Sequence, residues 1–201
     1  MAEPTVLQRH LSGAARPPVG PLDALREARR RFLKGERLDM GELAGGLGIS
    51  RATLYRWVGD REQLLGEVLW SFAEPGLEEA RRYADRTAKD DGADWVVRYN
   101  AHFVRATAEF EPIRRFLEAE PDLGLRILTS NRGVAEGRLI EVLRRTLEKR
   151  SNGGHLKLRL DAGDLAYAIV RISESFIWRE FITGEKPDLD RASEVVRVLL
   201  T

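Results

Sequence analysis

A glycine and a serine precede a run of polar and basic residues in the segment GISRATLYRWVGDREQLL, residues 48 to 65. Gly48 can adopt the positive φ that a sharp turn requires, because it has no Cβ to clash. Ser50 is suited to cap a following helix, since its hydroxyl can accept a hydrogen bond from an orphan backbone N–H. The polar residues that come next would then lie outside a short helix, available to a binding partner.

The outward residues of this short helix have the chemistry expected of contacts with double-stranded DNA. Arg51 can donate to the edge of a guanine, and Ala52 allows close approach or contact with a thymine methyl. Thr53, Tyr55 and Arg56 can donate hydrogen bonds to phosphates or base edges. The candidate DNA-binding residues of this segment are therefore Ser50, Arg51, Ala52, Thr53, Tyr55 and Arg56.

The apolar residues around this face predict two helices that cross at a tight angle. Counted from Met40, places 4, 8, 10, 15 and 18 are occupied by Leu43, Leu47, Ile49, Leu54 and Trp57. Ala44 at place 5 is small where the second helix comes close, and Gly48 at place 9 allows the turn. Seven agreeing places indicate a helix-turn-helix. The alternative is that the motif serves packing only and its polar residues are ordinary surface residues.

Catalytic and metal chemistry find little support in the sequence. HExxH, a Gly-rich phosphate loop and a nucleophile elbow are all missing, and there is no cysteine. The three histidines are far apart: His10, His102 and His155. The acidic residues of the polar break at 88–94 are interpreted as a solvated loop and helix start: Asp90, Asp91 and Asp94. We expect no enzyme, no metal site and no cofactor.

Composition predicts a globular protein without a membrane span. The 201 residues are 43% hydrophobic and 32% charged, enough for one sizeable domain or a small module plus a larger one. No apolar run reaches the roughly 18 residues of a membrane span, and the first twenty residues lack the apolar centre of a signal peptide. Together with the missing cysteines, this favours a cytoplasmic location.

The charge is close to balanced along the chain. Residues 1 to 67 carry 11 Lys/Arg against 9 Asp/Glu, a net of +2, and the remainder carries 22 against 23, a net of −1. A strongly basic nucleic-acid domain would have a much larger excess. Any phosphate contact must therefore depend on the local placement of a few basic residues.

Hydrophobic periodicity predicts an all-α protein. After an arm at 1–20 that carries Arg9, His10 and Arg16, the expected helices cover 21–34, 39–47, 51–58, 61–73, 75–87, 94–110, 112–119, 121–129, 133–150, 161–183 and 189–200. Pro75 is expected to end one helix and to open the next. The arm is either a tail without function or a segment that touches DNA.

The segment LAGGLGISRATLYRWVGDREQLL resembles the N-terminal signature of TetR-type transcriptional regulators, and the match extends over about residues 22 to 68. The resemblance implies that Tyr55 and Arg61 hold the DNA backbone. Where the family commonly has Lys and Phe, this chain has Arg61 and Val58, which keep the charge and the apolar anchor. The implied organisation is an arm at 1–20, a DNA-binding domain at 21–68 and a ligand-binding and dimerisation domain at 69–201.

The C-terminal segments LAYAIVRISESFIW and ITGEKPDLDRA are similar to the QsdR-like branch of that family, which implies an all-α domain that binds a small molecule and dimerises. A sensing cavity is mostly apolar with a few polar anchors. The candidate ligand-binding residues are Tyr99, His102, Phe103, Phe116, Arg171, Glu174 and Trp178. Arg171 and Glu174, one turn apart, could instead form a surface ion pair or lie in a dimer interface.

These expectations combine into one function and one alternative. The function is a homodimeric regulator, a repressor that a small apolar or amphipathic effector releases from a palindromic operator in double-stranded DNA. Its dimer interface is expected on helices 133–150 and 161–183, where Leu139, Val142, Leu143 and Leu147 form an apolar stripe. The alternative is a ligand-binding or scaffold protein that keeps the helix-turn-helix for packing only.

Overall fold

The structure is a computed structural model and describes residues 19–130 and 134–201. The three basic residues of the expected N-terminal arm, Arg9, His10 and Arg16, lie outside the described residues. Within the described ranges every regular element is a helix, so the predicted all-α fold is confirmed. None of these helices is both long and apolar enough to cross a membrane.

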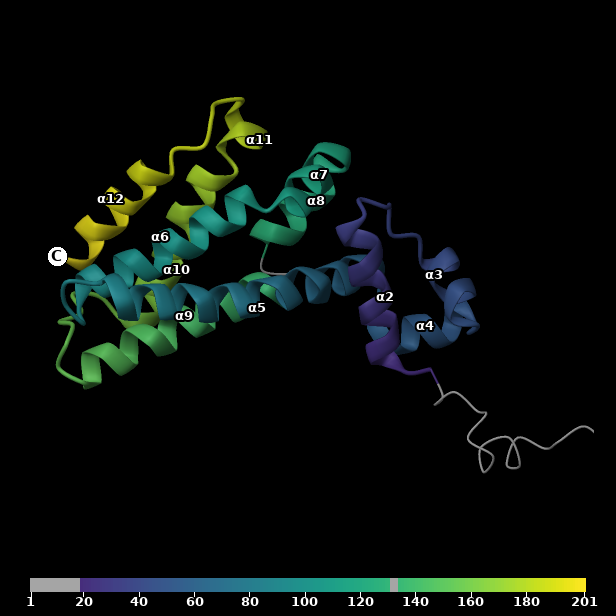
Figure 1. The fold of residues 1–201 in the computed structure, drawn as a ribbon, viewed down its shortest axis with the longest axis horizontal. Helices are drawn as coiled ribbons and strands as arrows, with labels where there is room; N and C mark the ends of the chain where they lie inside the picture. Colours follow the sequence, from purple (N-terminus) through teal and green to yellow (C-terminus); the bar gives the residue numbers. More distant parts are fainter. Residues whose placement is uncertain (1–18, 131–133) are drawn as a thin grey trace, which may run out of the picture.

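Three short helices form a head at one end of an elongated molecule (Figure 1). They are α2 (Pro21–Leu33), α3 (Met40–Leu47) and α4 (Arg51–Val58). The helix α2 begins with proline, whose fixed φ suits the first helical position. Its small residues Ala24 and Ala28 are fully buried in the apolar core of the head. The head is thus a three-helix unit with the expected helix-turn-helix inside it.

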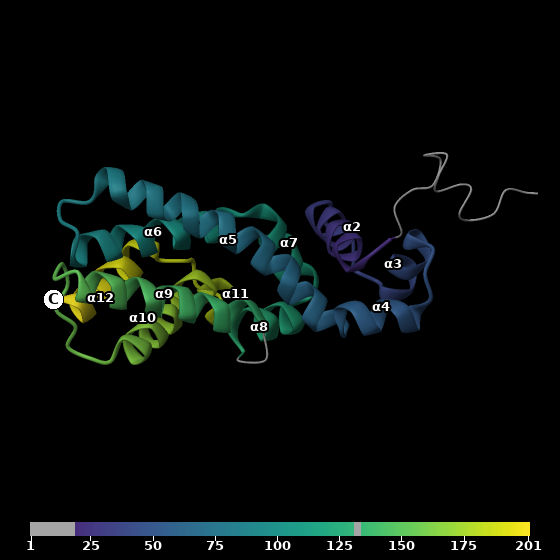
Figure 2. The same cartoon turned by 90° about the horizontal axis from the view of Figure 1, so that it is seen from below.

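The larger body contains α5 (Arg61–Thr87), α6 (Ala93–Glu109), α7 (Glu111–Ala119), α8 (Pro121–Thr129), α9 (Val134–Asn152), α10 (Ala162–Ile177), α11 (Arg179–Thr183) and α12 (Leu189–Leu200). Figure 2 shows α5 running from the head along the body, beside α6. The boundary expected between residues 68 and 69 falls inside α5, so head and body share this helix.

The expectation that a helix ends at Pro75 is wrong, because α5 continues through it to Thr87. Proline removes one backbone N–H, which leaves the carbonyl four residues earlier, at Ser71, without its helical partner. Pro75 lies on the exposed side of α5, where water can satisfy that carbonyl. Buried residues on both sides, including Leu69 and Leu77, keep the two halves packed and the helix continuous.

The single long helix expected over 161–183 is also wrong, because α10 ends at Ile177 and α11 starts at Arg179. Between them Trp178 has φ −92° and ψ 13°, which turns the chain and buries the indole to 3% exposure. A break of one residue leaves the spacing of hydrophobic residues across the two helices almost unchanged. The hydrophobic periodicity of the sequence therefore could not reveal the break.

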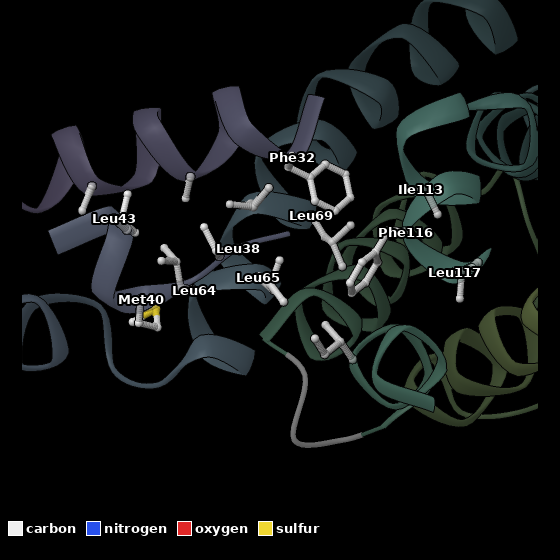
Figure 3. Close-up of a cluster of buried hydrophobic side chains, with 14 of the residues drawn as sticks. Phe32, Leu38, Met40, Leu43, Leu64, Leu65, Leu69, Ile113, Phe116 and Leu117 are labelled. Atoms are coloured by element: carbon white, nitrogen blue, oxygen red, sulfur yellow. The ribbon is translucent and has the colours of Figure 1, made fainter. Parts of the chain in front are cut away.

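A continuous apolar cluster joins the head to the body. Figure 3 shows Phe32 of α2 beside Leu69 of α5 and close to Ile113 and Phe116 of α7. The ring centroids of Phe32 and Phe116 are 5.5 Å apart. A second cluster fills the far half of the body and includes Leu143 and Leu147 of α9.

The inward position of α9 changes one expectation about the dimer. Leu143 and Leu147 are 4% and 0% exposed, and Leu139 and Val142 pack against the same cluster. Two residues of the apolar stripe predicted for a dimer interface therefore lie in the core of their own chain, and the other two, Leu139 and Val142, are partly buried against it.

The acidic residues before α6 meet the expectation of a solvated segment only in part, because Asp90 and Asp91 are exposed and Asp94 is buried. The carboxylate of Asp94 is 6% exposed and accepts hydrogen bonds from Lys89 N at 2.9 Å and Arg98 Nε at 2.7 Å. Arg197 of α12 reaches the same carboxylate at 3.3 Å. Asp94 therefore ties α12 to the start of α6.

Candidate functional site

The turn between α3 and α4 is built as its residues predict. Gly48 has φ 68° and ψ 28°, a left-handed conformation that favours glycine. The hydroxyl of Ser50 accepts the backbone N–H of Thr53 at 3.1 Å and caps α4. Asp39 caps α3 in the same way, with its carboxylate 2.7 Å from Gly41 N. Both helices of the motif are thus fixed at their starts by side chains.

The inner face of α4 is held by the core of the head. Leu54 and Leu43 are both fully buried and Ala44 is 1% exposed, so the two helices touch where the sequence has a small residue. Trp57, which the spacing placed in the shared core, is only partly buried. The shared core therefore centres on Leu54, and Trp57 lies at its edge.

The outer face of α4 is open to solvent. Five of the six candidate residues on this segment are exposed: Ser50, Arg51, Ala52, Tyr55 and Arg56. Thr53 is partly buried, and its hydroxyl lies 2.9 Å from that of Ser50. These polar groups share one face of a helix narrow enough for the DNA major groove, which admits an α-helix.

A hollow of about 280 Å³ next to this face collects three guanidinium groups. Arg51 and Tyr55 of α4 line it together with Arg61 and with Arg37 from the α2–α3 connection. Arg51 lies so close to α3 that a Cβ on Gly41 would be 2.3 Å from its Nη2. The sequence did not identify Arg37, whose side chain is 79% exposed. Arg37 lies outside the helix-turn-helix motif, so the spacing of the motif could not point to it.

Arg61 connects the head to the body in addition to lining this hollow. Its two terminal nitrogens donate to the carboxylate of Glu120 at 2.8 and 2.5 Å, and its Nε donates to Leu38 O at 2.7 Å. The hydrogen bond from Arg61 lowers the pKa of the Glu120 carboxyl below its usual range. A DNA phosphate would have to compete with Glu120 for this guanidinium.

The body contains a mostly apolar cavity of about 280 Å³ beside Pro75. Side chains from α5 through α10 line it, among them Phe72, Phe103, Phe110, Leu139 and Ile177. The exposed Ala106 on its wall places an opening toward solvent beside α6. A larger cleft of about 610 Å³ between α5, α6 and α9 has a charged rim, including Glu78, Arg81 and Lys149, and is less suited to an apolar ligand.

The charged groups that line the cavity come from α9 and α10. Glu136 and Glu174 line its wall, and Arg171 donates to Glu174 Oε2 at 2.8 Å and to Thr129 O at 2.7 Å. Trp178 adds an indole Nε1–H that is buried without a hydrogen-bond partner among the described residues. The cavity is therefore apolar along most of its wall, and its two charged groups come from neighbouring helices.

The seven residues predicted to bind ligand are only partly brought together. Phe103, Glu174 and Trp178 line the cavity. Tyr99 lines a small extension of about 30 Å³ that shares Phe103 and Glu174 with it. Arg171 does not line the cavity and instead lines a separate hollow together with Glu136 and Tyr167.

The other two predicted residues face different neighbours. The ring of His102 stacks on Tyr83 at 4.3 Å between centroids, and Phe116 packs on Phe32 in the cluster that joins head and body. Neither lines the cavity. The sequence did not identify Glu136 as a cavity residue, because a glutamate in an amphipathic helix is normally expected on the surface. In the structure Glu136 is only 3% exposed.

Comparison with known proteins now places this geometry in a family. Residues 91–201 match the family described as tetracyclin repressor-like, C-terminal domain. The transcriptional repressor QsdR of R. erythropolis, from the TetR family, is 28% identical with a TM-score of 0.79, over 90% of this chain and 93% of that one. The TetR family repressor AlkX of Dietzia sp. strain DQ12-45-1b, implicated in biodegradation of n-alkanes, is 25% identical with a TM-score of 0.60, over 92% and 96%.

A comparison with curated proteins finds no match. The family match nevertheless covers more than half of the 201 residues, and the head supplies the helix-turn-helix that such regulators use. Members of this family are DNA-binding regulators with a ligand-binding C-terminal domain and are not enzymes. The chain belongs to the TetR family of transcriptional regulators.

Proposed function

We propose that this chain is a cytoplasmic, homodimeric repressor that binds a palindromic operator and leaves it when a small apolar or amphipathic ligand enters the cavity. In this proposal α4 enters the major groove, with Arg51 reading base edges. Tyr55, Arg56 and the basic hollow hold phosphates. The domains are an arm at 1–20, a reading domain at 21–68 and a sensing domain at 69–201.

The exposed polar face of α4 is the observation that carries this proposal. A helix kept only for packing has no use for Arg51, Tyr55 and Arg56 on a solvent-facing side. The same helix is anchored by the fully buried Leu54, so its outward groups are held at fixed positions. Fixed, exposed and polar groups support DNA recognition over the packing-only alternative.

Contacts between the cavity and the head support regulation by a ligand. Phe72 lines the cavity, and its ring lies 5.9 Å from Phe32 of α2 and 5.2 Å from Phe110. A ligand that displaces Phe72 or Phe110 would therefore act on a helix of the head. Operator half-sites lie about 34–36 Å apart, so a small change in head position is sufficient to prevent simultaneous binding.

The dimer interface is proposed on α10 and α12, since the apolar stripe of α9 packs against its own chain. Two large apolar side chains remain exposed there, Tyr167 at 53% and Val198 at 75%. The two helices pack side by side, and a pair from each subunit would form a four-helix bundle. Light scattering should give twice the chain mass of 22.7 kDa, and Val198→Glu should give the single mass.

Selection from random duplexes tests the function as a whole. We expect a two-fold symmetric site whose binding weakens steeply with salt, because phosphate contacts release counterions. The double variant Arg51→Ala/Arg56→Ala should lose this binding. The matched control, Arg82→Ala/Arg86→Ala, removes the same charge from an exposed part of α5 in the body and should bind like the wild type. Failure to enrich any sequence would reject the proposal.

A further inference from the structure

The charged side chains that line the cavity are both carboxylates. Glu136 comes from α9 and Glu174 from α10, and they are 3% and 9% exposed. Burying a carboxylate without compensation is costly, so a buried charge is normally paired. Whatever occupies the cavity has to suit two buried acidic groups.

The guanidinium of Arg171 forms ion pairs with both carboxylates. Arg171 forms an ion pair with Glu136 Oε1 through Nη2, and through Nη1 it donates to Glu174 Oε2 at 2.8 Å. Its guanidinium also lies 5.3 Å from the centre of the Tyr167 ring on the outer side of α10. Two carboxylates and one guanidinium leave an excess of one negative charge when all three are ionised.

One oxygen of this cluster has no partner. Among the described residues, Glu136 Oε2 is buried and accepts no hydrogen bond. Glu136 lines the cavity wall, so a ligand that turned this carboxylate toward the cavity would gain an acceptor that no described residue occupies. The nearby walls carry the rings of Phe72, Phe103 and Phe110, and aromatic faces attract cations.

We propose that the ligand of this cavity is an apolar amine, whose ammonium group lies between Glu136 and Glu174 while its hydrocarbon part lies among the phenylalanine rings. The proposal rests on the sensing function proposed above and assigns its chemical class. An ammonium group donates hydrogen bonds and balances the excess charge. A carboxylate ligand would add a third buried negative charge and would meet repulsion.

The ionisation of Glu174 agrees with this assignment. Burial raises its pKa to about 7, and Arg171 opposes that shift. Arg171 on its own helix donates to it, and the same guanidinium pairs with Glu136 of α9 and donates to the carbonyl of Thr129 on α8. Tyr99 and Asn100 of α6 share the wall of a small cavity with it. Near neutral pH the free protein therefore holds a proton on part of its Glu174, and an entering ammonium group would displace it.

Three probes with eight carbons each test the charge of the ligand: n-octylamine, octanamide and octanoate. Calorimetric titration of the full chain at pH 7 should show octylammonium binding at least about ten-fold tighter than either of the others. Proton release, read from the dependence of the heat on the buffer, should accompany octylammonium alone. Equal or tighter binding of octanoate or octanamide, or no binding of octylammonium, would overturn the proposal.

Charge-neutral variants locate the contact. Glu136→Gln and Glu174→Gln should each weaken octylammonium binding by about ten-fold or more, whereas Glu148→Gln, on α9 outside the cavity lining, should leave it unchanged. Unchanged binding in both cavity variants would reject the assigned contact. The probe comparison on the wild type decides the question even if a variant fails to fold.

Release from the operator is measured separately, so that the two proposals can fail independently. Octylammonium that binds in the cavity without releasing DNA would contradict the sensing function and leave the ligand class standing. Release of DNA by octanoate, with no response to octylammonium, would support the sensing function and overturn the ligand class.

Discussion

The DNA-reading head and the sensing cavity are built in opposite ways. The head places most of its functional residues on two helices of eight residues each and one turn, and Arg37 and Arg61 directly flank this stretch of sequence. The cavity draws residues from α5 through α10, as far apart in sequence as Leu69 and Trp178. Spacing therefore defines the first site, whereas only the packing of helices defines the second.

The two sites also treat charge differently. In the head, Arg51, Arg56 and Arg37 are exposed, where a charge costs little and a phosphate can approach. In the cavity, Glu136 and Glu174 are buried, where a charge is costly unless it has a partner. Substitutions should thus change DNA affinity at the head and change stability and ligand choice at the cavity.

The largest effect is expected from the buried charge of Glu174. Its pKa is about 7 in the folded protein against an ordinary value of 4.5. Between these values the folded protein keeps the proton that the unfolded chain has released, so the free energy of unfolding decreases as pH rises through this window. Above pH 7 this decrease in the free energy of unfolding is complete. It amounts to a few kcal/mol, because one pKa unit corresponds to about 1.4 kcal/mol.

Denaturant unfolding of the wild type and of Glu174→Gln from pH 4 to 8 measures this effect. The glutamine cannot ionise, so the difference between the two proteins should shift in favour of the variant as pH rises. A difference that stays constant across the range would mean that Glu174 keeps its charge in the folded state.

A smaller but sequence-specific effect is expected at the head. Arg51→Ala should relax the preference at one base pair of each half-site by about 1–3 kcal/mol, because one bidentate contact carries that discrimination. Competition binding against single-base operator variants measures it. Equal weakening on every sequence would instead identify Arg51 as a phosphate contact, as expected for Tyr55→Phe.

The ion pair between Arg61 and Glu120 tests the junction between head and body. Arg61→Ala should weaken binding on all sequences alike and reduce the salt slope by about one ion. Glu120→Gln frees the guanidinium and should strengthen binding by several-fold, since the pair is only partly buried and such pairs contribute about 0–1 kcal/mol.

Glu62→Gln is the control for this pair, because Glu62 also joins α5 to α8, through Arg126 at 2.7 Å, without touching Arg61. If Glu62→Gln strengthens binding as much as Glu120→Gln, general charge removal explains the gain. An unchanged salt slope in Arg61→Ala would show that this residue serves the junction between head and body.

The last comparison concerns the stability of the head alone and uses two glycines of the motif. A Cβ on Gly45, inside α3, would meet nothing within 4 Å, so Gly45→Ala should stabilise the protein by about 1 kcal/mol. Gly48→Ala should destabilise it by about 1–2 kcal/mol, because Gly48 has φ 68° and a left-handed residue with a Cβ is strained. Thermal unfolding of the two variants should therefore shift in opposite directions.

The sequence was sufficient to predict the structure wherever contacts between residues close in the chain determine it. The turn at Gly48, the cap at Ser50 and the outward face of α4 depend on contacts within a few residues, and all three could be predicted. His102 shows why the cavity could not be: its spacing matched Phe103 and Tyr99, but the side of α6 that faces the cavity depends on where α5 and α10 pack. Glu136 gave no signal for the same reason.

Pro75 gives α5 a mechanical role. The helix runs unbroken from Arg61 at the head to Pro75 at the rim of the cavity, about 21 Å at 1.5 Å per residue. At Pro75 one backbone hydrogen bond of the helix is missing, because proline has no N–H. Bending is easiest at such a point. A bend of about 5° at Pro75 would move Arg61 and the reading helix by roughly 2 Å, because they lie at the far end of this length of helix. A ligand that only shifts the cavity wall can therefore still move the reading helix out of the DNA major groove.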